Sequence, residues 1–197
     1  MTDIRICFVG DSFVNGTGDP ECLGWSGRLC ASQCRQGRAI TYYNLGVRRE
    51  TSADIRDRWF KEVSCRLPAP EGGRVVFSFG TNDTTLESQG TRVKLADSIK
   101  NTHTILSLAI QHYPVLMISP PPIADDAQNS RTADLVTHFA QLCYELTVPY
   151  LNVFAPLQQS AVWQREVQTG DGAHPAAAGY ATLASMIEEW ADWKAWF

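Results

Sequence analysis

Serine, histidine and aspartate side chains, which together can make a serine nucleophilic, lie near the two ends of this chain. Ser12 follows Gly10 and Asp11 directly after an apolar run, and Asp171 and His174 lie three residues apart near the other end. A free serine hydroxyl is a poor nucleophile and needs an adjacent base. A turn between Asp171 and His174 would let the carboxylate orient the imidazole, which would then take the proton from Ser12. The pattern therefore predicts acyl transfer through Ser12.

Acyl transfer also needs hydrogen-bond donors for the oxyanion that develops on the substrate. Three candidates are the backbone N–H of Ser12, the backbone N–H of Gly46 and the side-chain amide of Asn82. Glycine at position 46 would let the chain approach a substrate closely. Loss of one such donor in a known hydrolase raises the barrier by about 2.7–4 kcal/mol, which is the effect we expect for Asn82→Ala.

Apolar runs that read as strands alternate with helical patterns, which is typical of a parallel sheet with helices on both faces. Strands are expected at 4–9, 40–45, 74–79, 115–119 and 150–153, and helices at about 25–36, 52–63, 91–112, 132–146 and 176–193. A turn-rich connection is expected from Pro68 to Gly73. Because parallel strands end at one edge of a sheet, Ser12, Gly46 and Asn82 should converge there. Nothing resembles a linker or a repeat, so residues 1–197 are expected to form one three-layer α/β/α domain.

The overall composition excludes several classes of protein. Apolar residues make up 44% and charged residues 19%, which is typical of a globular domain and not of a disordered chain. The net charge of -4, without a basic run, argues against a nucleic-acid partner. No apolar stretch is long enough to span a bilayer and no targeting segment is visible, so we expect a cytoplasmic protein with reduced cysteines.

Neither a metal nor an organic cofactor is expected. Cys30 and Cys34 are four apart, but no second pair at zinc-like spacing accompanies them, so we interpret both as small buried residues of a helix. The loop Gly16-Thr17-Gly18 suggests flavin or nucleotide binding. It lacks the Gly-Lys-Ser/Thr ending of a phosphate loop and the full dinucleotide pattern.

Four short blocks resemble, in the same order, those of the SGNH hydrolases, also called GDSL esterases/lipases: Gly10-Asp11-Ser12, Asn44-Leu45-Gly46, Gly80-Thr81-Asn82-Asp83 and Asp171-Gly172-Ala173-His174-Pro175. The resemblance implies a flavodoxin-like, five-stranded parallel sheet of order 2-1-3-4-5. It also implies Ser12 as nucleophile, His174 as base and Asp171 as orienting acid, with Ser12, Gly46 and Asn82 forming the oxyanion hole. Phe13 replaces the family's leucine, and we expect its side chain to point into the core behind the nucleophile.

The activity implied by this resemblance is hydrolysis of a carboxylic ester or thioester through an acyl-Ser12 intermediate, without a cofactor. Similar proteins include acetylesterases, lysophospholipases, thioesterases and simple esterases or lipases. The short loops of this chain favour short acyl groups. The alternative is a non-catalytic carbohydrate- or lipid-binding module on the same fold.

Other residues leave alternatives open. Arg48 and Arg49 suit an anionic substrate group, although ion pairs with Glu50 and Asp54 are the simpler interpretation. The C-terminal aromatic residues either pack on the sheet or form an exposed apolar patch for lipid contact or a homo-oligomer; they are Trp190, Trp193, Trp196 and Phe197. Three further histidines are expected to be packing or surface residues, namely His103, His112 and His138.

Overall fold

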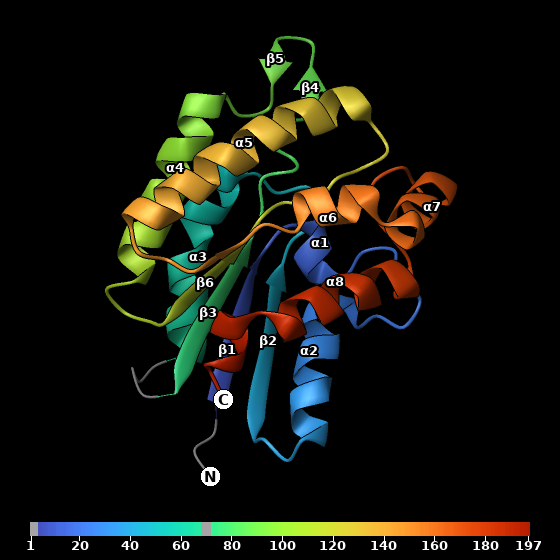
Figure 1. Ribbon diagram of the computed structural model, residues 1–197. Helices are drawn as coiled ribbons and strands as arrows, with labels where there is room; N and C mark the ends of the chain where they lie inside the picture. Colours follow the sequence, from blue (N-terminus) through green and yellow to red (C-terminus); the bar gives the residue numbers. More distant parts are fainter. Residues whose placement is uncertain (1–3, 68–71) are drawn as a thin grey trace.

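A five-stranded parallel sheet forms the centre of the computed structural model, which describes residues 4–67 and 72–197 (Figure 1). The strand order is β2-β1-β3-β6-β7, with every neighbouring pair parallel. The strands are β1 (Ile4–Gly10), β2 (Ile40–Gly46), β3 (Gly73–Ser78), β6 (Val115–Ile118) and β7 (Tyr150–Leu151). The order 2-1-3-4-5 is thereby confirmed, because β4 and β5 form a separate hairpin outside the sheet.

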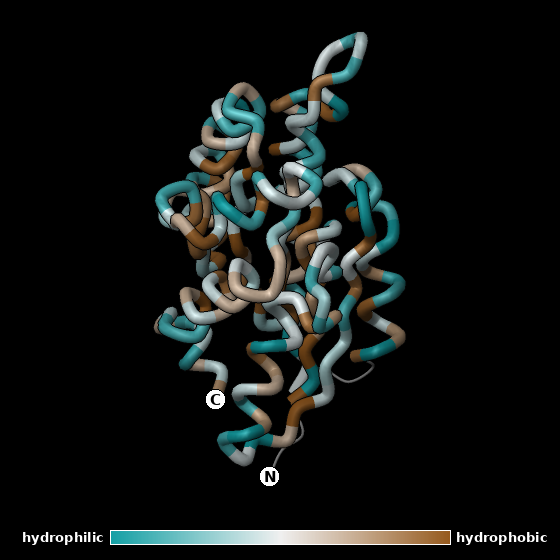
Figure 2. Tube along the Cα trace, turned by 90° about the vertical axis from the view of Figure 1, so that its right-hand side faces the viewer, coloured by the Kyte–Doolittle hydropathy of each residue, from teal (hydrophilic) through white to brown (hydrophobic). Residues whose placement is uncertain are grey.

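Each face of the sheet is covered by its own set of helices. Alternate side chains of a strand point to opposite faces, so that Ile6 and Phe8 join one apolar core and Cys7 and Val9 the other. The face of Cys7 is covered by α3 (Ser52–Arg66), α4 (Leu95–Ala109) and α5 (Asp126–Glu145). The face of Phe8 is covered by α1 (Ser12–Asn15), α2 (Gly24–Arg35), α6 (Phe154–Gln159), α7 (Ala161–Thr169), α8 (Ala177–Glu189) and α9 (Ala191–Lys194). Hydrophobic residues accordingly concentrate inside the trace (Figure 2).

The register of the sheet brings the sequence blocks to one edge. Gly10, at the end of β1, lies beside Gly46 at the end of β2 and beside Ser78 at the end of β3. The segments that follow these three strands therefore leave the sheet at the same edge, as the sequence predicts.

Helix boundaries differ from the sequence prediction where local capping or packing decides them. The helix expected from 91 begins at Leu95, because Gly90–Thr91 pairs with Leu86–Glu87 in the projecting β4–β5 hairpin (Figures 1 and 2). The helix expected from 132 begins six residues earlier, because the Asp125 side chain accepts the Gln128 N–H and caps it. The helix expected over 176–193 is interrupted at Trp190, whose backbone is extended. The predicted turn over 68–73 lies largely outside the described residues.

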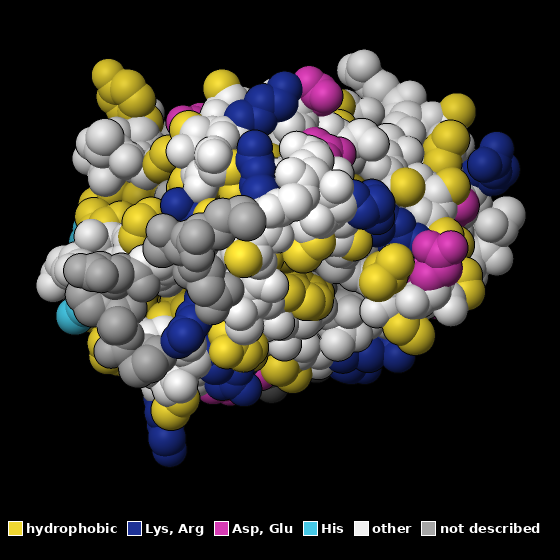
Figure 3. Space-filling model, turned by 90° about the horizontal axis from the view of Figure 1, so that it is seen from below, with side chains coloured by type: hydrophobic (Ala, Val, Ile, Leu, Met, Phe, Trp, Pro, Cys, Tyr) yellow, Lys and Arg dark blue, Asp and Glu magenta, His cyan; other side chains and the backbone are white. Residues whose placement is uncertain are grey.

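The C-terminal aromatic residues pack on the core. Trp193 is fully buried and lies near Phe8, with a distance of 6.3 Å between ring centroids. Trp190, Trp196 and Phe197 are partly buried against the same core. In a view of this end of the molecule, apolar side chains are interspersed with basic and uncoloured ones (Figure 3). The packing interpretation is therefore the better one.

Other surface predictions are partly correct. His103, His112 and His138 are exposed, as expected. Cys30 is buried, but Cys34 is exposed, so the prediction that both are buried is wrong for Cys34. Among residues 4–67 and 72–197, no helix is both long and apolar enough to cross a membrane.

Candidate active site

Ser12 is the first residue of α1, at the point where β1 ends. The turn depends on Gly10, since a Cβ there would lie 1.9 Å from the Ser78 carbonyl oxygen. Asp11 caps the helix, because its Oδ1 accepts the Phe13 N–H at 3.0 Å. The Ser12 side chain is therefore not needed as the cap and faces a cavity at the sheet edge.

Asp171 and His174 are brought together by a tight turn between α7 and α8. The Asp171 Oδ1 accepts the backbone N–H groups of Ala173 and His174 at 3.0 and 2.8 Å. Its Oδ2 lies 2.7 Å from His174 Nδ1. Burial raises the pKa of Asp171, but the backbone and side-chain hydrogen bonds from His174 and the one from Ala173 outweigh it, and lower this pKa to about 2. Asp171 is thus a carboxylate, which leaves Nδ1 of His174 as the donor.

The other nitrogen of His174 faces the serine. Nε2 lies 2.7 Å from Ser12 Oγ. Since Nδ1 carries the proton that Asp171 accepts, neutral His174 presents a lone pair at Nε2. The predicted Ser12, His174 and Asp171 therefore form one continuous chain of hydrogen bonds, although they come from the two ends of the sequence.

The ring of His174 packs against the ring of Phe13. The ring centroids lie 4.9 Å apart, and Phe13 in turn stacks on Trp163 at 6.3 Å. Phe13 is buried in the core, as predicted, but its contact with His174 was not predicted. Phe13 therefore limits the orientations of the imidazole, and Trp163 packs behind Phe13.

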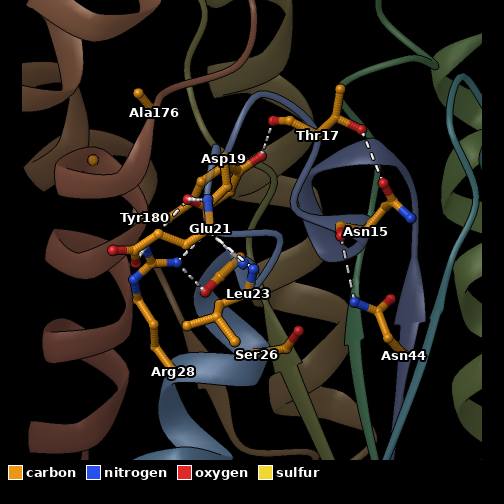
Figure 4. A network of polar contacts seen from close by, with 12 residues as sticks. Asn15, Thr17, Asp19, Glu21, Leu23, Ser26, Arg28, Asn44, Ala176 and Tyr180 are labelled. Atoms are coloured by element: carbon orange, nitrogen blue, oxygen red, sulfur yellow. Dashed lines mark hydrogen bonds and ion pairs between the residues drawn. The ribbon is translucent and has the colours of Figure 1, made fainter.

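The glycine-containing loop after α1 packs against the same histidine. A Cβ on Gly18 would lie 3.1 Å from the His174 Cβ, so the loop packs closely against the histidine. The Tyr180 hydroxyl donates to the Thr17 carbonyl at 2.7 Å, which ties the loop to α8 (Figure 4). The Asp19 carboxylate accepts bonds from Arg28 and from the backbone that begins α2. This loop is a structural support.

Asn82 reaches the same edge from the segment after β3. Its Nδ2 donates to the Glu50 carbonyl at 2.9 Å, which fixes the amide while leaving its second N–H for another acceptor. The adjacent Asp83 accepts the Ser52 N–H at 2.7 Å and so anchors this segment to the start of α3. Asn82 and Ser12 line the same cavity, which fits the predicted role of Asn82 as a donor.

Gly46 is not brought to this cavity. Its N–H donates to Asn44 Oδ1 at 2.9 Å, and a Cβ at this position would lie 2.1 Å from the Asn15 nitrogen. Glycine is required here because α1 packs directly on the end of β2. The predicted role of Gly46 as an oxyanion donor therefore stays a prediction without a supporting contact.

Two buried carboxyl groups lie next to the site without entering it. Burial raises the pKa of Asp11 to about 7; the Phe13 N–H lowers it, and nearby Asp83 and Glu50 raise it further. Burial likewise raises the pKa of Asp83, against hydrogen bonds from Ser52 and Ser98. Each keeps one carboxylate oxygen without a hydrogen-bond partner among the described residues. We assign them to the shaping of the loops.

The cavity beside Ser12 has a volume of about 260 Å³. Nine of its twelve wall residues lie in the four sequence blocks or are named in the sequence analysis, whereas Thr85, Ile123 and Gln128 are not. The wall consists of Ser12, Phe13, Arg48, Arg49, Thr81, Asn82, Thr85, Ile123, Gln128, Asp171, Ala173 and His174. Within the described parts of the chain, no cluster of three or more His, Cys, Asp or Glu residues could hold a metal ion.

Comparisons with solved structures agree with this architecture. The lipase/acylhydrolase from Enterococcus faecalis is 20% identical, with a TM-score of 0.74 over 93% of both chains. An acetylxylan esterase from Geobacillus stearothermophilus is 16% identical, with a TM-score of 0.73 over 93% of this chain and 91% of that one. A G-D-S-L lipolytic protein from Veillonella parvula is 19% identical, with a TM-score of 0.78 over 95% and 97%.

No curated protein matches the chain in sequence. The model of the GDSL-like Lipase/Acylhydrolase family matches residues 8–182, which is most of the chain and includes all four sequence blocks. The chain therefore belongs to the GDSL-like lipase/acylhydrolase family.

Proposed function

We propose that this protein is a serine esterase that hydrolyses carboxylic esters or thioesters with short acyl groups through an acyl-Ser12 intermediate. The observation that carries the proposal is the chain of two 2.7 Å contacts from Ser12 Oγ through His174 to Asp171. A binding module on the same fold would not need this ordered set of groups. Family membership and the fold shared with esterases support the same conclusion.

The reaction follows from the positions of these atoms. Ser12 Oγ attacks the acyl carbon while His174 Nε2 takes its proton, and Asp171 stabilises the imidazolium that forms. The Ser12 N–H and the Asn82 amide donate to the tetrahedral oxyanion. His174 then protonates the leaving oxygen or sulfur, and water releases the acyl group by the same steps. A contribution from the Gly46 N–H would require Asn44 to release it.

The preference for short acyl groups rests on the cavity. A volume of about 260 Å³ lies below the roughly 300–1,000 Å³ of pockets for drug-sized ligands. Part of its wall is also held in place, because Gln128 Nε2 donates to the Thr81 carbonyl at 2.8 Å and to Thr85 at 3.1 Å. An acyl chain of many carbons would have to leave the cavity or displace this network.

Hydrolysis of a series of p-nitrophenyl esters, from acetate to decanoate, tests the proposal. We expect turnover by the wild-type protein with the highest kcat/KM at the shortest chains. A maximum at long chains would contradict the size argument. Absence of turnover with all esters, and with acyl thioesters and acetylated sugars, by folded protein would overturn the proposed function and favour the binding module.

Replacement of Asn82 by alanine tests the oxyanion donor. We expect kcat to fall by about 10²–10³-fold, because one donor to the oxyanion is lost, with a smaller change in KM. Asn82→Asp is the matched variant, since it keeps the shape of the side chain and removes the donor. The melting temperature must be measured alongside, because Asn82 also donates to Glu50. An unchanged kcat in both variants would exclude this role.

A further inference from the structure

The cavity beside Ser12 carries an excess of positive charge. Its charged wall residues are Arg48, Arg49 and Asp171. The Asp171 carboxylate is already occupied by His174 and by two backbone N–H groups. The two guanidinium groups are thus the charges that a bound substrate would meet.

Neither arginine is tightly paired. The Arg48 side chain is 63% exposed, and its Nη2 lies 3.9 Å from Asp171 Oδ2, a distance at which a surface ion pair contributes little. Across residues 4–67 and 72–197, the Arg49 side chain forms no ion pair. The ion pairs expected with Glu50 are absent for both, because Arg58 binds Glu50 at 2.6 Å.

Arg49 is also held in an unfavourable backbone conformation. Its φ of 72° lies in the left-handed region, which costs a residue other than glycine of the order of 1 kcal/mol or more. The Arg92 side chain fixes this conformation by donating to the Arg49 carbonyl at 2.8 Å. Arg49 thus occupies a position where glycine would fit with less strain.

The position of Arg48 indicates which part of the substrate it meets. His174 Nε2 must reach the leaving-group oxygen in order to protonate it. Arg48 lines the cavity together with Ser12 and His174, and its Nη2 lies 3.9 Å from Asp171, the carboxylate bound to that imidazole. We propose that the preferred substrate is an ester whose leaving group carries an anionic group, a carboxylate or a phosphate, bound by Arg48 with Arg49 adding positive charge. This inference rests on the proposed function.

A pair of acetate esters tests it, namely p-acetoxybenzoate and its neutral analogue p-acetoxybenzamide. We expect wild-type kcat/KM to be about 10-fold or more higher for the anionic ester, mainly through KM, because a hydrogen bond to a charged group is worth about 1.5–3 kcal/mol. Added salt should reduce the ratio. p-Acetoxyphenyl phosphate shows whether a phosphate is preferred to a carboxylate, and preference for either supports the proposal.

Variants separate this effect from general charge. Arg48→Gln should reduce the ratio towards one, and Arg48→Lys should restore part of it. Arg35→Gln removes the same charge from an exposed position at the end of α2 and should leave the ratio unchanged. A ratio near one in the wild type, or an unchanged ratio in Arg48→Gln, would overturn the proposal.

Two further outcomes are informative. A preference for an anionic acyl group is measured by comparing mono-p-nitrophenyl glutarate with p-nitrophenyl pentanoate. If the protein prefers the anionic acyl group but not the anionic leaving group, the proposal is also overturned. Hydrolysis of neither acetate would instead count against the proposed esterase function. Equal hydrolysis of both acetates would contradict the anion preference alone.

Discussion

Replacing Ser12 by alanine is expected to lower kcat by about 10⁶-fold for every ester that the wild type hydrolyses, as for the nucleophile of another Ser-His-Asp triad. The change removes the atom that the acyl group must join, whereas His174 alone offers no comparable acyl acceptor. The fold should survive, because Asp11 and not Ser12 caps α1. Ser12 is buried at 3% exposure, and alanine fits the same space.

Steady-state hydrolysis of p-nitrophenyl acetate measures this loss. Ser26→Ala is the matched control, because Ser26 is also a buried serine. It lies in α2, hydrogen-bonds to Tyr42 and does not line the cavity. The control should keep its activity. Retention of more than about one hundredth of the wild-type kcat by Ser12→Ala would mean that another group is the nucleophile.

Asp171→Asn is expected to lower kcat by about 10⁴-fold, the loss that follows from the wrong histidine tautomer in another triad. One oxygen of Asp171 accepts two backbone N–H groups, and the other accepts the His174 Nδ1 proton. An asparagine must keep its single oxygen on the backbone donors, so its NH₂ group would face Nδ1. His174 would then place its proton on Nε2, where it blocks proton transfer from Ser12.

The pH dependence of this variant is also predicted. Since the pKa of Asp171 is lowered to about 2, the wild-type residue is ionised above about pH 4, and the activity loss should persist between about pH 5 and 8. Because the pKa of Asp171 is lower in the folded protein than its value of 3.8 in the unfolded chain, the carboxylate stabilises the fold above pH 3.8. This contribution to stability is lost as the pH falls towards 2. The difference in melting temperature between wild type and Asp171→Asn should therefore shrink below about pH 4.

Asp134→Asn is the control for Asp171→Asn. Asp134 also lies near a histidine, with 3.7 Å between its Oδ1 and His138 Nε2, but this pair is on the surface of α5. The control should leave kcat unchanged. Wild-type activity in Asp171→Asn would show that Asp171 does not orient His174.

A parallel sheet and its converging strand ends could be predicted from local patterns in the sequence, whereas the order 2-1-3-4-5 was implied only by the family resemblance. Apolar runs ending in polar turns define parallel strands, and such strands end at one edge. The three-residue spacing between Asp171 and His174 permits the turn that the structure shows. This turn is decided within a few residues, whereas the contact between His174 and Ser12 joins residues 162 positions apart.

Features that depend on tertiary packing were not predictable in this way. The helices α6 and α7 have six and nine residues, too few for a clear apolar period, and are held by burial of Leu157, Trp163 and Val167. Gly46 matched the motif, but α1 packs on it and Asn44 takes its N–H. The left-handed Arg49 gave no sequence signal, because arginine carries no preference for that conformation.

The acyl-Ser12 mechanism is tested most directly by finding which residue becomes covalently modified by a fluorophosphonate. Attack by Ser12 Oγ on phosphorus would release fluoride and leave a stable Ser12 phosphonate, which peptide mass spectrometry locates. We expect one label per chain, on Ser12, with none in Ser12→Ala and slower labelling in Asp171→Asn. A label on any other residue, or labelling of Ser12→Ala at the wild-type rate, would contradict the acyl-Ser12 mechanism.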